Sequence, residues 1–319
     1  MVSEARIREE LDNVLEQTDF QVGRRVAGKV RDSYLLPGGR RLLVTTDRIS
    51  AFDCILGTIP FKGQVLNQLA AFWFERTRAV CPNHLLAVPD PNVMLVAECE
   101  QLPLEFIVRG YITGVTKTSA WHHYSAGARL LAGNLLPEGL RKDQRLDRPI
   151  LTPTTKHEAH DRNLSREEAV AEGLITPARF DEAAALCLRL YQAGVAHAAA
   201  RGLILVDTKY ELGLRDGRLV VSDEIHTPDS SRYWHADTYA ARFAAGEEQR
   251  KLDKEYVREW LAARGFRGDG TPPALPDEVR VEAARRYLTA YEQITGQPFE
   301  PAEGPIGERV RQAVAAFSR

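Results

Sequence analysis

Carboxylates and a lysine alternate along one predicted strand in the second half of the chain. Side chains on a strand alternate between its two faces, so Asp207, Lys209 and Glu211 share one face. An Asp-Gly turn pairs this strand with the next one, which brings Asp223 close to the same face. Crowded carboxylates repel one another unless a cation compensates them, and hard oxygen ligands suit Mg2+ that also binds phosphate. The alternative is an ion-pair ladder on the surface, which the apolar run just before Asp207 makes less favourable.

Three further segments have residue types that could bind phosphate or carboxylate groups. Lys29 and Arg31 alternate on a predicted strand and could cover the phosphates of a nucleotide, or they form a solvent-facing basic strand. A Pro-Asp-Ser turn places Asp229 near Arg232, and the two could clamp a polar substrate or form a local ion pair. Arg109 ends a strand before a glycine-bearing loop, where a guanidinium suits bidentate recognition of an anion, although a structural arginine fits equally.

Composition excludes several classes of protein. The 319 residues are 44% hydrophobic and 27% charged, and 42 basic against 44 acidic residues leave no overall basic field for nucleic acid. No apolar run approaches the roughly 18–20 residues that cross a bilayer, and the N-terminus lacks a signal-peptide pattern. The four cysteines are too scattered for a disulfide framework or a zinc site. We therefore expect a folded cytoplasmic protein without nucleic-acid or membrane partners, as a monomer or small homo-oligomer.

The elements that must position these residues are expected to form an α+β fold. An antiparallel sheet crossed by a helix fits the pattern better than strict βαβ alternation. Apolar periodicity predicts an amphipathic helix near residues 4–18 and another after Gly63. The strands predicted around that second helix are 29–36 with 41–46, and 92–98 with 104–109.

The second half begins with a polar segment and continues as helices and a hairpin. Residues 125–165 are rich in Pro, Gly and Arg without clean periodicity, which predicts a long ordered loop. Ser165 begins a capping box, and Thr176 with the proline after it starts a helix that runs to Ala200. The remaining predicted elements are strands 203–207 and 218–223, then helices from 236 onward with a break at 268–276.

Six segments follow one another along the chain, at 28–32, 46–53, 106–114, 151–156, 206–211 and 222–234. Together they resemble the SAICAR synthetase family of phosphoribosylaminoimidazole-succinocarboxamide synthases. The chain is similar to the longer monofunctional form, which has an extended middle loop and a helical C-terminal tail.

The resemblance implies a reaction and a division of the chain. It implies an ATP-dependent ligase of purine biosynthesis that joins L-aspartate to 4-carboxy-5-aminoimidazole ribonucleotide (CAIR), giving SAICAR, ADP and phosphate. It also implies an N-terminal antiparallel ATP-covering domain at 1–103 and a larger α+β catalytic domain at 104–235. A helical C-terminal extension at 236–319 is expected to pack on the catalytic domain, and the active-site cleft lies between the first two domains.

The same resemblance implies a role for each candidate residue. Lys209 is expected beside the transferring phosphoryl group, with Asp229 and Arg232 as the other catalytic residues, and the backbone after Glu98 is expected to bind adenine. The residues expected to bind ATP are Lys29, Arg31, Glu98, Glu100 and Lys156, and those expected to hold Mg2+ are Glu211 and Asp223. The residues expected to bind substrate are Ser50, Asp53, Arg109, Ser119, Asp161, Asp207, Asp229 and Arg232.

The expected mechanism is activation of the CAIR carboxylate as an acyl phosphate, followed by displacement of phosphate by the aspartate amine. Positioning and charge neutralisation are what such a phosphoryl transfer needs, and the sequence contains no nucleophile motif. The amine must lose a proton, and a carboxylate such as Asp229 or the phosphate itself could accept it. The competing hypotheses are a small-molecule kinase with a similar ATP cleft and a nucleotide-binding regulatory module.

Overall fold

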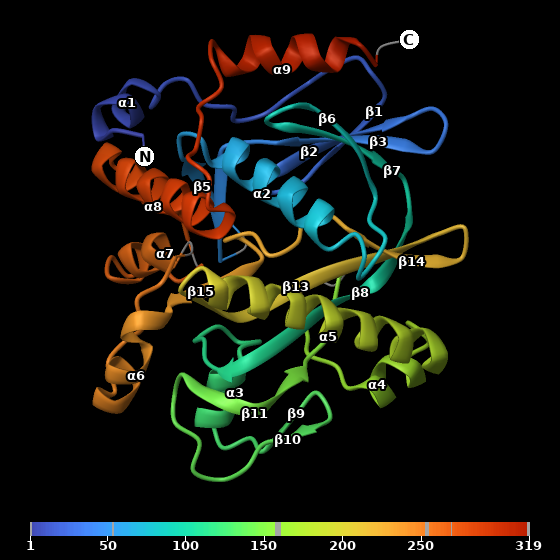
Figure 1. The fold of residues 1–319 in the computed structure, drawn as a ribbon, viewed down its shortest axis with the longest axis vertical. Coiled ribbons are helices and arrows are strands. Elements are labelled where there is room, and N and C mark those ends of the chain that lie inside the picture. Colours follow the sequence, from blue (N-terminus) through green and yellow to red (C-terminus); the bar gives the residue numbers. More distant parts are fainter. Residues whose placement is uncertain (1, 53, 157–160, 253–254, 269, 318–319) are drawn as a thin grey trace.

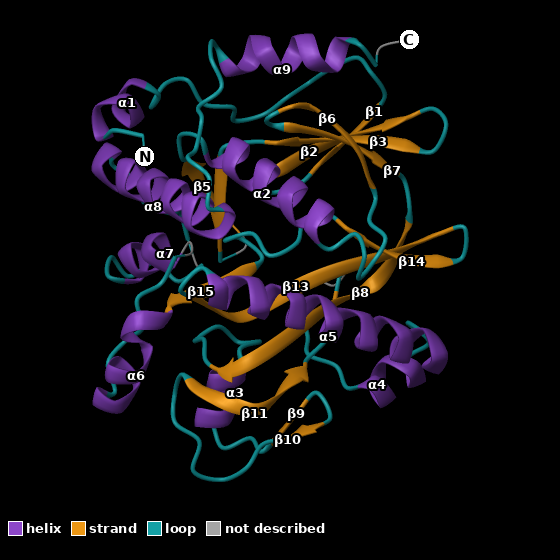
Figure 2. Ribbon diagram, in the orientation of Figure 1, coloured by secondary structure: helices purple, strands orange, loops and turns teal. Residues whose placement is uncertain are grey.

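The structure is a computed structural model that describes residues 2–52, 54–156, 161–252, 255–268 and 270–317. Among these residues, two larger antiparallel sheets, two small two-stranded sheets and the surrounding helices make up the fold. The expected α+β class is confirmed (Figure 1, Figure 2). In this described part of the chain, no helix is long and apolar enough to cross a membrane.

The first sheet has five strands and lies in the upper part of Figure 1. In spatial order they are β1 (Arg24–Ala27), β2 (Arg31–Leu36), β3 (Arg40–Thr45), β7 (Val93–Ala97) and β6 (Leu85–Asp90). A separate two-stranded sheet pairs β4 (Arg48–Ala51) with β5 (Cys54–Thr58).

The second sheet is built on two strands of 13 residues each, β8 (Glu100–Ile112) and β13 (Leu203–Arg215). Both are longer than predicted, because each continues past its apolar run and pairs along its charged residues. Its other strands are β11 (Gln144–Leu151) and β12 (Thr154–Thr155) beside β8, and β14 (Arg218–Ser222) and β15 (Ser231–His235) beside β13. A separate hairpin pairs two short strands of two residues each, β9 (Leu130–Leu131) and β10 (Asn134–Leu135).

The first hairpin differs from its prediction. Gly28 donates its backbone N–H to the carbonyl of Arg31 at 2.8 Å, which closes a turn between β1 and β2. Lys29 lies in this turn and is exposed, whereas Arg31 is the first residue of β2. The prediction that Lys29 and Arg31 share one strand face is therefore wrong.

The N-terminal helix is also shorter than its apolar pattern predicted. Helix α1 covers Glu4–Glu9 instead of 4–18. The segment after it is held by contacts with distant residues, because Leu15 donates its N–H to the carboxylate of Asp47 at 2.8 Å. The apolar side chain of Leu15 is buried without needing a helix.

The predicted helix after β5 is confirmed as α2 (Lys62–Arg76), and a close backbone contact fixes its start. A Cβ on Gly63 would lie 2.5 Å from the carbonyl oxygen of Thr45, so only glycine lets the helix approach β3 this closely. The carboxylate of Asp47 accepts the N–H of Gly63 at 2.8 Å and caps this end. Lys62, in the first turn, is consequently buried in the interior.

The middle of the chain contains more structure than the predicted loop. Residues 125–165 include four strands, of which β11 pairs with β8 through an irregular register that hides the alternating pattern. The capping box at Ser165 is confirmed at the start of α4 (Arg166–Ala171), and Thr176 caps α5 (Pro177–Ala200) as expected. Helix α5 packs against β13 and β8. Helix α3 (Ala120–Ser125) follows the loop after β8.

The C-terminal segment is helical as expected, with its break before residue 277. Its helices are α6 (Ala236–Ala245), α7 (Glu255–Ala262), α8 (Asp277–Thr295) and α9 (Ile306–Ala315). Helix α6 packs on β15, but α8 packs on α1 and α2, and α9 packs on β6 and β7 (Figure 1). Helix α8 also contacts residues 104–235, because Arg201 donates from Nε to the carbonyl of Gln293 at 2.9 Å. The expectation that the whole segment packs on residues 104–235 stays a prediction.

Candidate active site

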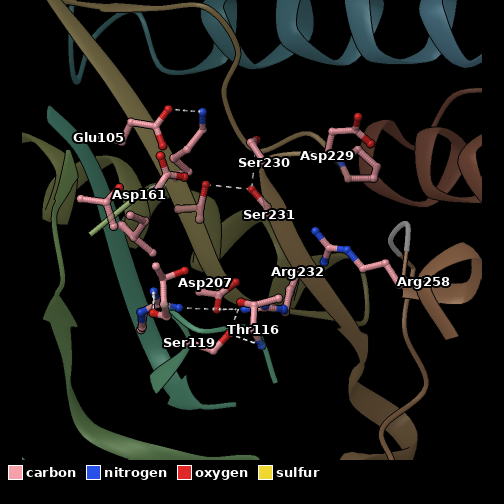
Figure 3. A pocket seen from close by; sticks show the side chains of 17 residues that line it. Glu105, Thr116, Ser119, Asp161, Asp207, Asp229, Ser230, Ser231, Arg232 and Arg258 are labelled. Carbon is pink, nitrogen blue, oxygen red and sulfur yellow. Dashed lines mark hydrogen bonds and ion pairs between the residues drawn. The ribbon is translucent and has the colours of Figure 1, made fainter. Parts of the chain in front are cut away.

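A cavity of about 180 Å3 lies where β13 passes between β8 and β15. Strand register decides which side chains meet there, because Asp207 is the cross-strand neighbour of both Arg109 and Arg232. In Figure 3, Glu105 and Asp161 lie on one side of the cavity and Asp229 and Arg258 on the other. The remaining charged or hydroxyl side chains that line it are Thr116, Thr118, Ser119, Thr154, Thr208, Lys209, Ser230 and Ser231.

Asp207 compensates two guanidinium groups at the floor of the cavity. Its Oδ2 lies 2.5 Å from Nη1 of Arg232 and 3.5 Å from Nη1 of Arg109. Burial, together with the nearby Arg232, lowers the pKa of Arg109 to about 10 although Asp207 opposes the shift. The two guanidinium groups therefore meet at the same carboxylate, and their charge suits this part of the cavity to an anionic group.

Thr152 and the loop after β8 hold Arg109 and the neighbouring hydroxyl groups in place. Arg109 donates from Nε to Thr152 Oγ1 at 2.8 Å. A Cβ on Gly114, which has a φ of +89°, would lie 2.5 Å from Ser119 Oγ and 3.0 Å from Arg232 Nη2. Glycine is therefore required where the loop brings Ser119 against Arg232.

The predicted acid–lysine face on β13 exists, and Glu105 of β8 and Lys156, directly after β12, complete it. Lys209 Nζ lies 2.7 Å from Glu211 Oε1 and 2.8 Å from Glu105 Oε1, and Lys156 also pairs with Glu211. Burial opposes ionisation of Lys209, but Glu211, Glu105 and Asp223 raise its pKa well above the ordinary value. Burial likewise opposes ionisation of Glu211, yet Lys209 and Lys156 hold the pKa of that carboxyl below its ordinary range.

Asp223 joins this cluster to the first sheet. Arg31 Nη1 lies 3.1 Å from Asp223 Oδ1, and Arg31 Nη2 lies 2.7 Å from Glu224 Oε2. Burial raises the pKa of Asp223, and the neighbouring Glu211 and Glu224 add to the shift while Arg31 opposes it. Burial and two acidic neighbours therefore disfavour the ionised form of Asp223, whereas Arg31 favours it.

Asp229 lines the cavity, and both of its carboxylate oxygens contact residues outside the predicted site. Lys62 Nζ lies 2.9 Å from Oδ2, and the Tyr287 hydroxyl donates to Oδ1 at 2.5 Å. The predicted partner Arg232 forms an ion pair with Asp207.

The predicted residues Glu98, Glu100 and Ser50 are not among the described residues that line the cavity. Glu98 accepts two hydrogen bonds from Arg41 at 2.6 Å in the connection between β7 and β8, and the exposed Glu100 begins β8. Ser50 is buried on β4, outside the set of described residues that line the cavity. Asp53 lies outside the described residues.

Sequence reasoning missed Glu105, Arg258, Lys62 and Tyr287. Glu105 alternates with apolar residues on β8, which was a usable signal for a side chain facing the same way as Arg109. Arg258 comes from α7, and Lys62 and Tyr287 come from α2 and α8, which no local pattern connects with the cavity.

The chain is similar to known proteins along most of its length. The model of the SAICAR synthetase family matches residues 24–273. A phosphoribosylaminoimidazole-succinocarboxamide synthase of Legionella pneumophila is 49% identical over 300 residues, covering 93% of this chain and 96% of that protein. One of Bacteroides fragilis is 46% identical over 312 residues, covering 95% and 98%. A solved SAICAR synthase from Saccharomyces cerevisiae, in complex with SAICAR, has a TM-score of 0.78 at 33% identity and covers 90% of this chain and 100% of that one.

Proposed function

The chain belongs to the SAICAR synthetase family, and from that premise we propose which residues perform the family reaction and by what route. The reaction joins L-aspartate to the carboxylate of CAIR and converts ATP to ADP and phosphate. One observation supports placing it in this cavity: strand β13 carries the acid–lysine cluster and, two residues earlier, the aspartate between two guanidinium groups. A phosphoryl donor and an anionic acceptor bound at these two places would be adjacent.

ATP is proposed to bind along the first hairpin and the start of β8. In this proposal Lys29, in the hairpin turn, and Arg31, on β2, contact the phosphates from the first sheet. Lys209 on β13 and Lys156, directly after β12, neutralise phosphate charge from the other side. The backbone around Glu98 and Glu100, between the two sheets, supplies hydrogen bonds to adenine.

Glu211 and Asp223 are the residues we propose for Mg2+. Among the described residues, no group of three or more Asp, Glu, His or Cys is arranged as a metal site. Two carboxylates nonetheless fit Mg2+ here, because this ion is usually held by one or two carboxylates together with substrate phosphates. The acidic neighbours Glu211 and Glu224 raise the pKa of Asp223, so a cation bound here would stabilise its ionised form. When bound, Mg2+ would neutralise phosphate charge.

CAIR and L-aspartate are proposed to occupy the guanidinium side of the cavity. Arg109, Arg232 and Arg258 suit the phosphate and carboxylate groups of the two substrates. Asp207 holds two of these guanidinium groups in place. The predicted substrate residues Ser119, Asp161 and Asp229 line the same cavity, while Ser50 and Asp53 keep their roles as predictions.

In the proposed route, an oxygen of the CAIR carboxylate attacks the γ-phosphorus and ADP leaves. The side chain of Lys209 lies where it can neutralise charge on the transferred phosphoryl group. The aspartate amine then attacks the acyl carbon and phosphate leaves, so the chain needs to orient the reactants and exclude water but not to supply a nucleophile.

An ADP-release assay tests this proposal. With MgATP and CAIR present, ADP formation is expected to require L-aspartate, and the product is expected to contain its nitrogen. A kinase with a similar cleft would release ADP without L-aspartate, and that result would refute the ligase assignment. A regulatory module would bind nucleotide without turnover.

A further inference from the structure

The loop between β14 and β15 carries residues of both proposed binding places. It covers residues 223–230, beginning with Asp223, a proposed Mg2+ ligand, and ending with Pro228, Asp229 and Ser230, which line the cavity (Figure 3). Its backbone enters the left-handed region at Asp223, with a φ of +58°, and again at His226, with a φ of +54°. Residues with a Cβ adopt this conformation only at a cost, so other contacts must hold the loop in this shape.

His226, in the middle of the loop, is held by both its side chain and its backbone. Its ring is completely buried, and a hydrogen bond of 2.5 Å joins Nε2 to the hydroxyl of Tyr210. Tyr233 on β15 donates its hydroxyl to the carbonyl of His226 at 2.7 Å. The ring of Trp73 on α2 packs against the imidazole, with ring centres 4.6 Å apart. Side chains from β13, β15 and α2 therefore meet at this one residue.

Tyr210 connects the loop to the strand that carries the acid–lysine cluster. It lies on β13 between Lys209 and Glu211, so its side chain is on the opposite face from theirs. The Tyr210 hydroxyl thus reaches His226 behind the strand, whereas Lys209 lines the cavity. The end of the loop is attached to the same strand, because the Ser230 carbonyl accepts the N–H of Lys209 at 2.9 Å. The loop is fixed to β13 at both points, and the first depends on the side chain of His226.

Helix α5 passes so close to His226 that only glycine fits at position 194. A Cβ on Gly194 would lie 2.5 Å from Cε1 and 2.9 Å from Nδ1 of His226, and 2.7 Å from Cδ2 of Leu205. Glycine inside a helix weakens it relative to alanine. Among the residues that the structure describes, Nδ1 of the imidazole has no hydrogen-bond partner, which is a further cost in the interior. Several local costs therefore fall on the position of this one ring.

We propose that His226 is a positioning residue that holds the middle of the β14–β15 loop behind β13 and thereby fixes Asp223 and the cavity-lining end of the loop. Side chains that bind ligands act best when the contacts supporting them allow a single arrangement. This inference rests on the proposed function, because it takes the proposed Mg2+ and substrate places as what the loop serves. Loosening His226 should disturb both places without changing any residue proposed to touch a ligand.

Hydrogen exchange of the loop amides in Tyr210→Phe, followed by mass spectrometry without ligands, tests the attachment itself. This change removes only the hydroxyl that bonds to His226, and amides 223–231 are expected to exchange about fivefold faster. Tyr34→Phe is the matched control, because Tyr34 on β2 is also completely buried and its hydroxyl donates to Thr18 Oγ1 at 2.8 Å. In the control, the loop is expected to exchange as in wild type. Unchanged loop exchange in Tyr210→Phe, or an equal increase in Tyr34→Phe, would overturn the proposal.

Steady-state kinetics with Gly194→Ala tests the consequence for the site from a helix outside it. The added Cβ would collide with the imidazole. The Mg2+ concentration for half-maximal turnover, and the KM for CAIR or L-aspartate, are expected to rise about fivefold. Tyr210→Phe is expected to change these values in the same direction, so the test stands even if Gly194→Ala does not fold. A purely structural loss would lower the unfolding temperature and leave these values unchanged.

Gly307→Ala is the matched control for this kinetic test. Gly307 also lies in a helix, α9, but a Cβ there would meet no atom within 4 Å. The kinetics of this control are expected to equal those of wild type. If the Mg2+ requirement and both KM values of Gly194→Ala and Tyr210→Phe stay within about twofold of this control, the proposal is wrong.

These outcomes separate the two proposals. If wild type releases ADP without L-aspartate, the proposed function fails, and the exchange experiment still decides whether His226 holds the loop. If wild type requires L-aspartate but Tyr210→Phe and Gly194→Ala behave as their controls do, only the present inference fails.

Discussion

Replacing Asp207 by asparagine removes a carboxylate that lies between Arg109 and Arg232 and pairs with both. The Asp207 and Arg109 side chains are 6% and 5% exposed, whereas that of Arg232 is 21% exposed. Removing one partner of a buried ion pair costs about 3–5 kcal/mol. Since Arg232 can turn partly towards water, we expect the low end, a loss of about 3 kcal/mol in the free energy of unfolding.

An anion in the cavity should recover part of that loss. Inorganic phosphate is expected to stabilise Asp207→Asn more than it stabilises wild type, because two guanidinium groups are then left without their carboxylate. The measurement is urea unfolding at 25 °C with and without phosphate, with sodium chloride added to equalise ionic strength. Asp181→Asn is the control, because Asp181 pairs with Arg166 on the surface and is expected to show no measurable change.

Two results would refute this reasoning. A loss below about 1 kcal/mol would show that Asp207 does not compensate both guanidinium groups, since it falls in the range of a surface pair. An equal effect of phosphate on the variant and on wild type would show that the freed guanidinium groups do not form an anion site.

The remaining predictions concern the metal, the substrate and pH. Glu211→Gln and Asp223→Asn are each expected to lower Mg2+-dependent turnover at least about 100-fold with a native circular dichroism spectrum, and near-normal turnover would refute that ligand assignment. Arg232→Ala is expected to raise the KM for CAIR or L-aspartate about tenfold or more and leave that for ATP unchanged, and an unchanged substrate KM would contradict its role. Burial lowers the pKa of His84 to about 3 from an ordinary 6.5, so unfolded chains bind a proton that folded chains do not, and stability is lost as pH falls from 6.5 towards 3. Urea unfolding from pH 7 to 4 gives the slope of the free energy of unfolding against pH. This slope is expected to be smaller in His84→Gln than in wild type by up to about 1.4 kcal/mol per pH unit, and an identical slope in the two proteins would contradict this.

Sequence reasoning succeeded where the relevant physics is local. The alternation of Asp207, Lys209 and Glu211 on one strand face needs only the geometry of a strand, and Thr176 with the following proline suffices to start a helix. It failed where a distant contact replaced a local preference. Leu15 lies outside a helix because its N–H bonds to a carboxylate 32 residues away.

The site residues that were missed follow the same division. Lys62 reads from sequence as a surface lysine at a helix start, and it is buried only because Gly63 lets α2 approach β3. Tyr287 reads as one of several apolar positions of an amphipathic helix, and nothing within α8 shows that its hydroxyl reaches Asp229. Such residues can be found only once the packing of α2 and α8 is known.

The ion pairs of the proposed ATP site also link the binding of nucleotide to the binding of metal. Arg31, Lys156 and Lys209, the cations proposed to meet ATP phosphates, are paired here with Glu211, Asp223 or their acidic neighbours. In the proposed complex, phosphate oxygens take over these cations, and the carboxylates they leave require a new cation. A bound Mg2+ supplies that charge at Glu211 and Asp223, so nucleotide and metal binding should each strengthen the other. Without Mg2+, wild type must break the Arg31–Asp223 ion pair to bind ATP, and nothing replaces the charge that Asp223 loses. This cost offsets part of the contribution of Arg31, so Arg31→Met is expected to weaken ATP binding less without Mg2+ than with it. Equal weakening in titrations with and without Mg2+ would show that nucleotide and metal bind independently of this exchange.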